Sequence, residues 1–182
     1  MRPSKKTDIL EAAIHIIGEK GGLDALTFDS LAEASGLSKS GLIYHFPSRQ
    51  QLIIAVHQHL ADLWEEELCT IAGAPATELT PEARLRAFVC TMAHSANRAD
   101  LVCALNIAQE PEAAEAWESV MRRWAPNPAQ VEDDHAARTA YLVQLLAEGL
   151  WLHDHVNATP LTPGQRDALT EAVLNLIPTG KH

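Results

Sequence analysis

The 182-residue sequence predicts an all-α protein: an N-terminal three-helix head with a helix-turn-helix, joined by a long fourth helix to a helical C-terminal body. Three observations favour this class. Apolar residues recur at helical spacing along most of the chain, and segments of alternating Val and Ile that would indicate strands are absent. Capping residues also precede several of these apolar segments. We expect the head at residues 1–50 and the body, for effector binding and dimerisation, at residues 51–182.

The first helix is expected at residues 4–20, where one apolar stripe is followed by Gly21 and Gly22. Paired glycines commonly end a helix, because glycine adopts the left-handed conformation at little cost. The stripe consists of Ile9, Leu10, Ala13, Ile14 and Ile17.

Two short helices are expected between Thr27 and Phe46. The Thr27 hydroxyl can cap the first helix, which Gly36 ends, and Ser38 can cap the second. Leu42 and Phe46 lie four residues apart, so both can face inward and leave a polar outer face. A helix-turn-helix needs such a face to lay its second helix in a DNA major groove, whereas an ordinary αα-hairpin is the alternative for a short pair alone. The outer face carries Ser40, Gly41, Tyr44 and His45, with Lys39 at the helix entrance.

The long fourth helix is expected to begin at Arg49, after the capping residue Ser48, and to run to about Ile71. Its length would connect the head directly to the body. Its apolar positions are Leu52, Ile53, Val56, Leu60, Trp64 and Leu68.

The segment from residue 4 to residue 56 resembles the TetR-type transcriptional repressors. The motif that carries this resemblance runs from Leu31 to Lys39 and continues through Leu42, Tyr44-His45-Phe46-Pro47-Ser48-Arg49 and Leu52. The resemblance implies a dimeric repressor that binds a palindromic operator on double-stranded DNA and a small-molecule effector. It implies phosphate contacts at Thr27 and Arg49, and groove contacts at Ser38, Lys39, Ser40, Gly41, Tyr44 and His45.

Two positions depart from the family pattern. Ile43 stands where a tyrosine is common, so a phosphate contact made by that tyrosine is in doubt here. Gly41 stands where Thr, Ser or Ala is frequent, which removes a side chain that could touch a base. The segment Ser-Gly-Leu-Ile-Tyr-His-Phe is also similar to a subgroup that represses drug-efflux genes.

The formal net charge of −10 is confined to the predicted body. Residues 1–50 hold six of the 14 Lys and Arg residues and six of the 24 Asp and Glu residues, so the whole acidic excess lies in 51–182. Phosphate contacts are expected from five of the six basic residues of the head, and DNA affinity should fall steeply with salt. These residues are Arg2, Lys5, Lys6, Lys39 and Arg49.

The body is expected to contain helices that begin at Thr80-Pro81, near Leu101 and at Pro111, and a loop at residues 125–128. The two last helices, residues 138–154 and 162–177, are the expected homodimer interface. The first of them is apolar on nearly every side, so it must be covered on every side. A second subunit would provide that cover, with simple burial in the monomer core as the alternative.

Aromatic and methionine side chains concentrate in the body and indicate a pocket for a flat, lipophilic and perhaps cationic compound. Ordinary core packing is the alternative for each residue taken singly. Such a compound is expected to displace the fourth helix and change the spacing of the two heads. The expected lining is Trp64, Phe88, Met92, Asn106, Trp117, Met121, Trp124, Tyr141 and Trp151, with Glu110 and Glu148 as further polar candidates.

Several other classes of protein are disfavoured. The chain has neither a phosphate-binding glycine loop nor a Gly-x-Ser-x-Gly elbow, so no enzyme is expected. The His57-x-His59 and His153-x-His155 pairs would point to opposite sides of a helix, so no metal site or cofactor is predicted. With three cysteines, no signal peptide and no membrane span, a cytoplasmic protein is expected. A metal- or redox-responsive repressor and a helical interaction protein without DNA binding remain the alternatives.

Overall fold

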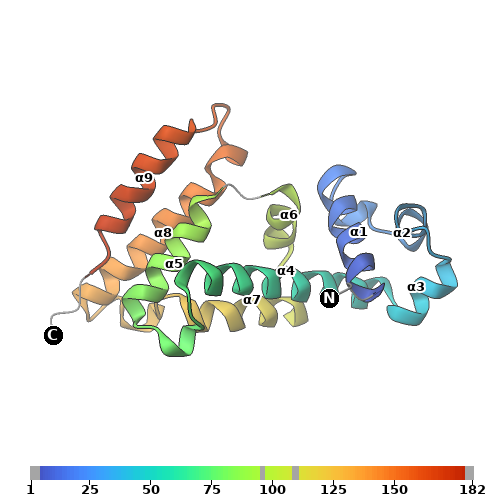
Figure 1. Cartoon of the computed structure of the whole chain (residues 1–182), viewed down its shortest axis with the longest axis horizontal. Helices are drawn as coiled ribbons and strands as arrows, with labels where there is room; N and C mark the ends of the chain where they lie inside the picture. The colour runs from blue at the N-terminus through green and yellow to red at the C-terminus, as the bar shows by residue number, and fades with distance from the viewer. Residues whose placement is uncertain (1–4, 95–96, 108–110, 179–182) are drawn as a thin grey trace. The chain divides into compact units, whose positions relative to one another are not determined.

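The computed structural model describes residues 5–94, 97–107 and 111–178, and over these ranges it confirms the all-α class (Figure 1). No β-strand occurs among these residues. Arg2, Ser4 and Glu110 lie outside the described residues. The α-helices are α1 (Lys5–Glu19), α2 (Phe28–Ser35), α3 (Lys39–His45), α4 (Arg49–Ala72), α5 (Pro81–Ala93), α6 (Arg98–Asn106), α7 (Pro111–Trp124), α8 (His135–Val156) and α9 (Pro163–Asn175). The 3-10 helices are η1 (Leu23–Ala25), η2 (Ala76–Glu78) and η4 (Pro128–Gln130).

The chain divides into two compact units, which we call the head unit and the body unit. The head unit comprises Met1–Asp62 with Asn97–Trp117, and the body unit comprises Leu63–Ala96 with Glu118–His182. Helices α4 and α7 therefore each contribute residues to both units. The predicted functional boundary between residues 50 and 51 stays a prediction, because compactness alone does not assign a function.

The head unit has a continuous apolar core built on α1. Ile9, Ile16 and Ile17 of α1 are fully buried, together with Leu31 of α2 and Leu42 of α3. Helix α6 adds Ala99 and Cys103 to the same core, and α4 adds Leu52, Ile53, Val56 and Leu60. This packing fixes α2 and α3 against α1, because buried apolar side chains leave little freedom for a helix to rotate.

Local capping explains why most predicted helix starts are confirmed. The Ser30 N–H donates to Thr27 Oγ1 at 3.1 Å, and the Gly41 N–H donates to Ser38 Oγ at 3.2 Å. In the body unit, Ala83 N donates to Thr80 Oγ1 at 3.2 Å. Each bond satisfies one of the N–H groups that a helix start leaves without a partner. Between α2 and α3, Gly36 has φ 68°, the left-handed conformation expected of it.

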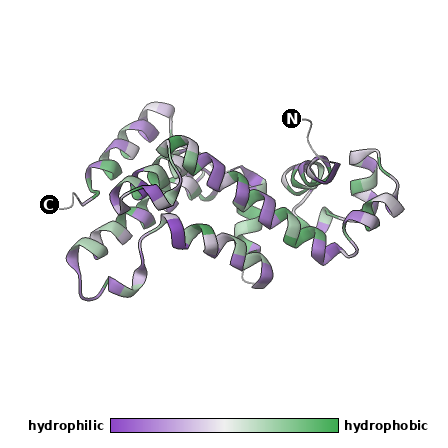
Figure 2. Ribbon diagram, turned by 60° about the horizontal axis from the view of Figure 1, so that its bottom comes forward, coloured by the Kyte–Doolittle hydropathy of each residue, from purple (hydrophilic) through white to green (hydrophobic). Residues whose placement is uncertain are grey.

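In the body unit, α8 packs against both α5 and α9. Figure 2 shows hydrophilic and hydrophobic residues mixed along each helix, as expected of amphipathic helices that bury one side. Phe88 of α5, Trp124 of α7 and Ala147 of α8 belong to the buried interior. No helix among the described residues combines the length and the apolar character that crossing a bilayer requires.

Candidate nucleic-acid interface and ligand cavity

Helix α3 presents a polar outer face on an apolar anchor, as the sequence predicts. Leu42 is fully buried and Phe46 is 2% exposed, whereas the Tyr44 side chain is 84% exposed. The Tyr44 and His45 rings meet edge to face, with centroids 5.4 Å apart, so each limits the movement of the other. Ser38, Lys39 and Ser40 are exposed, and Gly41 is half-buried. The structure therefore brings these predicted contact residues onto one accessible surface.

A steric reason accounts for glycine at position 41. A Cβ atom there would lie 3.3 Å from Ser38 Oγ, which is closer than an ordinary van der Waals contact. That oxygen is also the acceptor of the Gly41 N–H that caps α3. A larger residue at position 41 would therefore require the Ser38 hydroxyl to move by a few tenths of an ångström.

Lys39 is held by a carboxylate of α2. Its Nζ donates to Asp29 Oδ1 and Oδ2 at 2.9 and 3.1 Å. Both side chains are exposed, so the pair is worth little as a source of stability. It does place an acidic group beside the lysine expected to meet a phosphate. Sequence reasoning missed this pair, because its two residues lie ten positions apart and in different helices.

Replacing Asp29 with asparagine should strengthen DNA binding about threefold to tenfold. The change removes a negative charge that competes with the DNA phosphates for Lys39. Two protomers would each gain one lysine–phosphate contact, so the slope of log affinity against log salt should steepen by up to about 2. Titration of labelled operator between 50 and 300 mM KCl measures both quantities. Glu33→Gln, which removes another exposed carboxylate of α2, is the control. Equal gains from both variants would show that only net charge matters.

Arg49 binds η1 and its C-cap residue, which precede α2. Its Nε donates to the Leu26 carbonyl at 2.8 Å and its Nη2 donates to the Leu23 carbonyl at 2.5 Å, with Asp24 Oδ1 3.9 Å away. The guanidinium thus joins the start of α4 to the segment that leads into Thr27. Its predicted phosphate contact, like that of exposed Lys5 and that of Thr27, stays a prediction.

One side of α8 exposes an apolar stripe. Leu142, Leu145 and Leu146 are 53%, 47% and 47% exposed, although Val143, Ala147 and Leu150 of the same helix are buried. The alternative of complete burial in the monomer core is therefore wrong for this side of α8. The stripe continues at helical spacing through Gly149, where an added Cβ would meet no atom within 4 Å, to Leu152 and Val156. Leu169 of α9 and Leu176, the residue that follows this helix, are also exposed.

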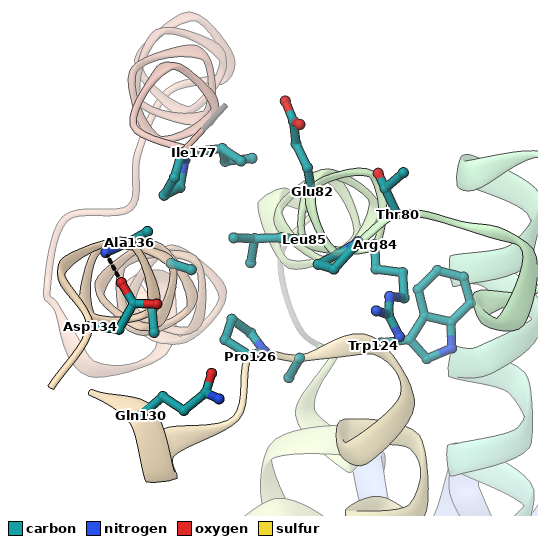
Figure 3. A pocket seen from close by; sticks show the side chains of 15 residues that line it. Thr80, Glu82, Arg84, Leu85, Trp124, Pro126, Gln130, Asp134, Ala136 and Ile177 are labelled. Carbon is teal, nitrogen blue, oxygen red and sulfur yellow. Dashed lines mark hydrogen bonds between the residues drawn. The ribbon is translucent and has the colours of Figure 1, made fainter. Parts of the chain in front are cut away.

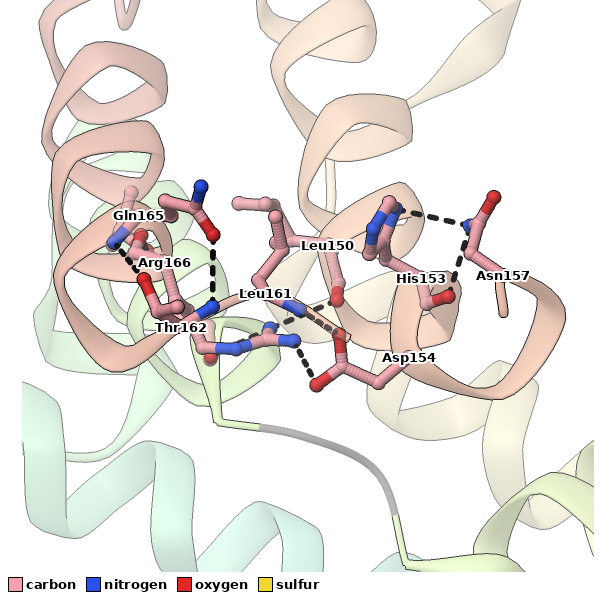
Figure 4. Close-up of polar contacts among 10 residues, drawn as sticks. Leu150, His153, Asp154, Asn157, Leu161, Thr162, Gln165 and Arg166 are labelled. Atoms are coloured by element: carbon pink, nitrogen blue, oxygen red, sulfur yellow. Dashed lines mark hydrogen bonds and ion pairs between the residues drawn. The ribbon is translucent and has the colours of Figure 1, made fainter. Parts of the chain in front are cut away.

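Arg166 fixes α9 to its neighbours (Figure 4). Its Nη1 donates to the carbonyls of Ala93 at 3.1 Å and Leu150 at 2.9 Å, and its Nη2 donates to Asp154 Oδ2 at 2.6 Å. Asp154 also accepts the Leu161 N–H at 3.0 Å, and this bond, followed by Arg166, lowers the pKa of Asp154. One half-buried arginine thereby joins the ends of α5 and α8 to the first turn of α9.

The predicted aromatic set is divided between the two units. Trp117 and Asn106 belong to the head unit, where Trp117 Nε1 donates to His57 Nδ1 at 3.1 Å and Asn106 Nδ2 donates to the Val102 carbonyl at 2.7 Å. In the body unit, Trp64 meets Phe88 edge to face, with centroids 5.8 Å apart. Met92, Met121, Tyr141 and Trp151 are half-buried members of the body unit. The roles of these residues in ligand binding stay predictions.

A cavity of about 720 Å³ lies within the body unit between α5, the connection from α7 to α8, and α8 (Figure 3). Of the predicted set, only Trp124 lines it. The rest of its wall was missed because its segments were interpreted as a helix start and a loop, which are structural signals. The lining comprises Thr80, Pro81, Glu82, Arg84, Leu85, Trp124, Ala125, Pro126, Gln130, Asp134, Ala136, Ala137, Ala140, Ile177 and Pro178.

Beside the cavity, Glu65 of α4 forms a charged cluster. Arg123 Nε and Nη2 donate to its two oxygens at 2.6 and 2.5 Å, and the Trp124 N–H donates to Oε1 at 3.2 Å. The Arg123 bond is the main cause of a lowered pKa of Glu65; burial opposes this shift, and the Trp124 bond adds to it. Arg84, which lines the cavity, donates to the Arg123 carbonyl at 3.0 Å.

Stability of the body unit should fall in acid. Glu65 and Asp154 both have a lower pKa folded than unfolded, so they stabilise the fold fully above about pH 4.5, the ordinary value for Glu. This contribution is lost as the pH falls through the folded pKa values. The urea midpoint should drop from pH 6 to pH 3.5, and Glu65→Gln should reduce that drop. Glu66→Gln removes an exposed carboxyl from the same turn and is the control; an equal reduction there would contradict the assignment to Glu65.

The arrangement of the His, Cys, Asp and Glu side chains bears on the alternative of a metal or redox sensor. No group of three or more His, Cys, Asp or Glu side chains that could hold a metal ion occurs among the described residues. Burial raises the pKa of the Cys69 and Cys90 thiols, and raises that of Cys103 to about 12. A thiol protonated at neutral pH is a poor nucleophile, which disfavours a role in redox sensing.

Two family models match the chain. "Bacterial regulatory proteins, tetR family" matches residues 9–56, and "Tetracyclin repressor-like, C-terminal domain" matches residues 82–178. The regulator RutR of Escherichia coli K12 is 38% identical over 61 residues, which are 34% of this chain and only 28% of RutR. The regulator BetI of Rhizobium meliloti is 26% identical over 186 residues, covering 96% of this chain and 90% of BetI.

Solved structures share the fold over nearly the whole chain. A transcriptional regulator of Streptomyces coelicolor A3(2) has a TM-score of 0.64 at 24% identity and covers 97% of this chain and 100% of its own. The multidrug binding protein EbrR, complexed with imidazole, has a TM-score of 0.61 at 17% identity, and the match covers 99% of this chain and 98% of that chain. A proposed regulator of Saccharomonospora viridis, in complex with choline, has a TM-score of 0.69 at 18% identity, with 94% of each chain covered.

Proposed function

Because the chain belongs to the TetR family of bacterial transcriptional regulators, whose members bind DNA and small-molecule effectors and are typically dimers, we propose that it is a ligand-released repressor. It would act in the cytoplasm as a homodimer on a palindromic operator. The observation that carries this proposal is the outer face of α3, where Tyr44 is 84% exposed on a helix anchored by buried Leu42 and Phe46. The relatives are regulators, which also disfavours an enzyme.

The exposed stripe of α8 supports dimerisation through residues 138–154 and 162–177. Its leucines recur every three or four residues on either side of Gly149, which has open space around it. Twofold symmetry would place this stripe against its own copy, where a glycine allows two helix backbones to approach closely. The two α3 helices would then meet successive turns of one DNA face, about 34 Å apart.

The proposed effector is a lipophilic cation, and the proposed target is a drug-efflux gene. The acidic excess of residues 51–182 favours cations, and aromatic side chains offer them favourable faces. EbrR complexed with ethidium and the Saccharomonospora viridis protein complexed with choline have this fold. Both ligands are cations, which supports the proposal by analogy.

Selection of random DNA by the purified full-length dimer tests the proposal. A palindromic sequence should be enriched, and its affinity should fall about a thousandfold or more between 50 and 200 mM salt if six or more phosphates are contacted. The same selection with a panel of lipophilic cations should show weaker enrichment. Failure to enrich any sequence at low salt would overturn the proposed function.

A further inference from the structure

We propose that the cavity between α5 and the start of α8 is the effector site, and that it takes a flat organic monocation. This inference rests on the proposed function and deepens it, because it assigns the effector to residues other than the predicted aromatic set. Pockets for small molecules are commonly concave, mostly apolar and about 300–1,000 Å³ in volume. The cavity, at about 720 Å³, has the right size for a compound of several fused rings.

The shape of the wall favours a flat compound. Ala136, Ala137 and Ala140 give α8 a surface of small side chains, and Leu85 of α5 points across the cavity toward them in Figure 3. Pro126 closes one side, and Ile177 lies on another. Alanine and proline keep their shape because they have few or no side-chain rotamers. A planar ring system can therefore fill the space without having to order long side chains.

The charges of the wall favour a cation. Its charged groups are the carboxylates of Glu82 and Asp134 and the guanidinium of Arg84. Arg84 already donates to the Arg123 carbonyl at 3.0 Å. Asp134 Oδ1 accepts the Ala136 N–H at 2.8 Å, while its second oxygen accepts no hydrogen bond from the described part of the chain. A single positive charge would balance the remaining excess of one carboxylate.

The cavity wall is hydrogen-bonded to α4. Trp124 lines the cavity, and its indole N–H reaches Glu65 of α4, which Arg123 also holds. Arg84 lines the cavity as well and holds the carbonyl of that same Arg123. A compound that shifts Trp124 or Arg84 must therefore change the bonds made to α4. Because α4 begins at Arg49, directly after the helix-turn-helix, those bonds offer a physical link between occupancy and DNA binding.

Ethidium fluorescence at pH 8 with the full-length protein tests the site. The parent should give a saturable signal, and uncharged phenanthridine should compete at least tenfold more weakly than a planar cation. Ala137→Phe, which fills the cavity, should weaken ethidium binding at least tenfold. Asp134→Asn keeps a capping oxygen for α8 but loses the charge, so it should weaken binding about threefold to tenfold. Ala129→Phe, at an exposed alanine outside the lining, is the matched control.

The possible results distinguish a failure of the proposed effector site from a failure of the proposed function. Unchanged ethidium affinity in a folded Ala137→Phe protein, or no saturable signal from the parent, would overturn the inference. If the parent still released selected DNA with another effector, the proposed function would stand. Should Ala137→Phe fail to fold, Ala140→Leu provides a milder filling of the same cavity and decides the question. Glu65→Gln at neutral pH should keep ethidium affinity within about threefold and reduce the effect of ethidium on operator affinity at least fivefold.

Discussion

Replacing Tyr44 with alanine is expected to weaken operator binding about a hundredfold. The loss of one good base contact typically costs about 1–3 kcal/mol, and a dimer loses two, so even about 1.4 kcal/mol per protomer gives this factor. Tyr44 is 84% exposed, and it contacts the His45 ring rather than the core. The stability of the head unit should therefore change little. Fluorescence anisotropy with a selected operator measures the affinity, and thermal unfolding measures stability.

The comparison variant for Tyr44 is Gln58→Ala. Gln58 is an exposed residue of α4 in the same unit, and its side chain donates to Asp62 rather than contributing to α3. It should bind operator like the parent. A Tyr44→Ala dimer that binds the operator as tightly as the parent would refute the assignment of Tyr44 to the DNA interface.

Replacing Leu146 with glutamate is expected to convert the dimer to monomers and abolish operator binding at nanomolar protein. Symmetry introduces two carboxylates into one apolar interface, and each buried, unpaired charge costs several kcal/mol. The dissociation constant of the dimer should rise at least a thousandfold. Leu146 is 47% exposed, so the monomer itself should keep its fold. Sedimentation velocity at micromolar protein reports the oligomeric state, and circular dichroism reports the helix content.

Leu105→Glu is the matched control for the interface. It makes the same substitution at an even more exposed leucine, 77% accessible, on α6 of the head unit. This variant should remain dimeric. If both variants dissociated, or if Leu146→Glu sedimented as a dimer, α8 would not form the interface proposed for it.

Sequence reasoning located the helices well because their boundaries depend on neighbouring residues. Thr27, Thr80 and Thr162 each cap a helix by accepting an N–H three residues ahead, a pattern visible in the letters alone. The inward positions of Leu42 and Phe46 follow equally from a spacing of four.

The candidate sites were predicted less completely because they depend on contacts between distant residues. Asp29 meets Lys39 ten positions along the chain, and Arg49 meets the Leu26 carbonyl across 23 positions. The cavity is assembled from residues as far apart as Thr80 and Pro178. No local pattern distinguishes an alanine that lines a cavity from one that simply favours a helix. Composition could indicate that the body binds a small molecule, but it could not show that Ala137 lines a cavity and that Trp151 does not.

The guanidinium of Arg49 links α4 to the helix-turn-helix by hydrogen bonds. By bonding the carbonyls of Leu23 and Leu26, it fastens the first turn of α4 to the chain that enters the Thr27 cap. Bending between α4 and the helix-turn-helix would break both bonds. A rotation of α4 should therefore rotate α2 and α3 with it, and should not change the orientation of α3 alone. Under the proposed function, an effector would therefore move two intact heads out of phase with the DNA helical repeat, and each head would keep its shape for the next operator.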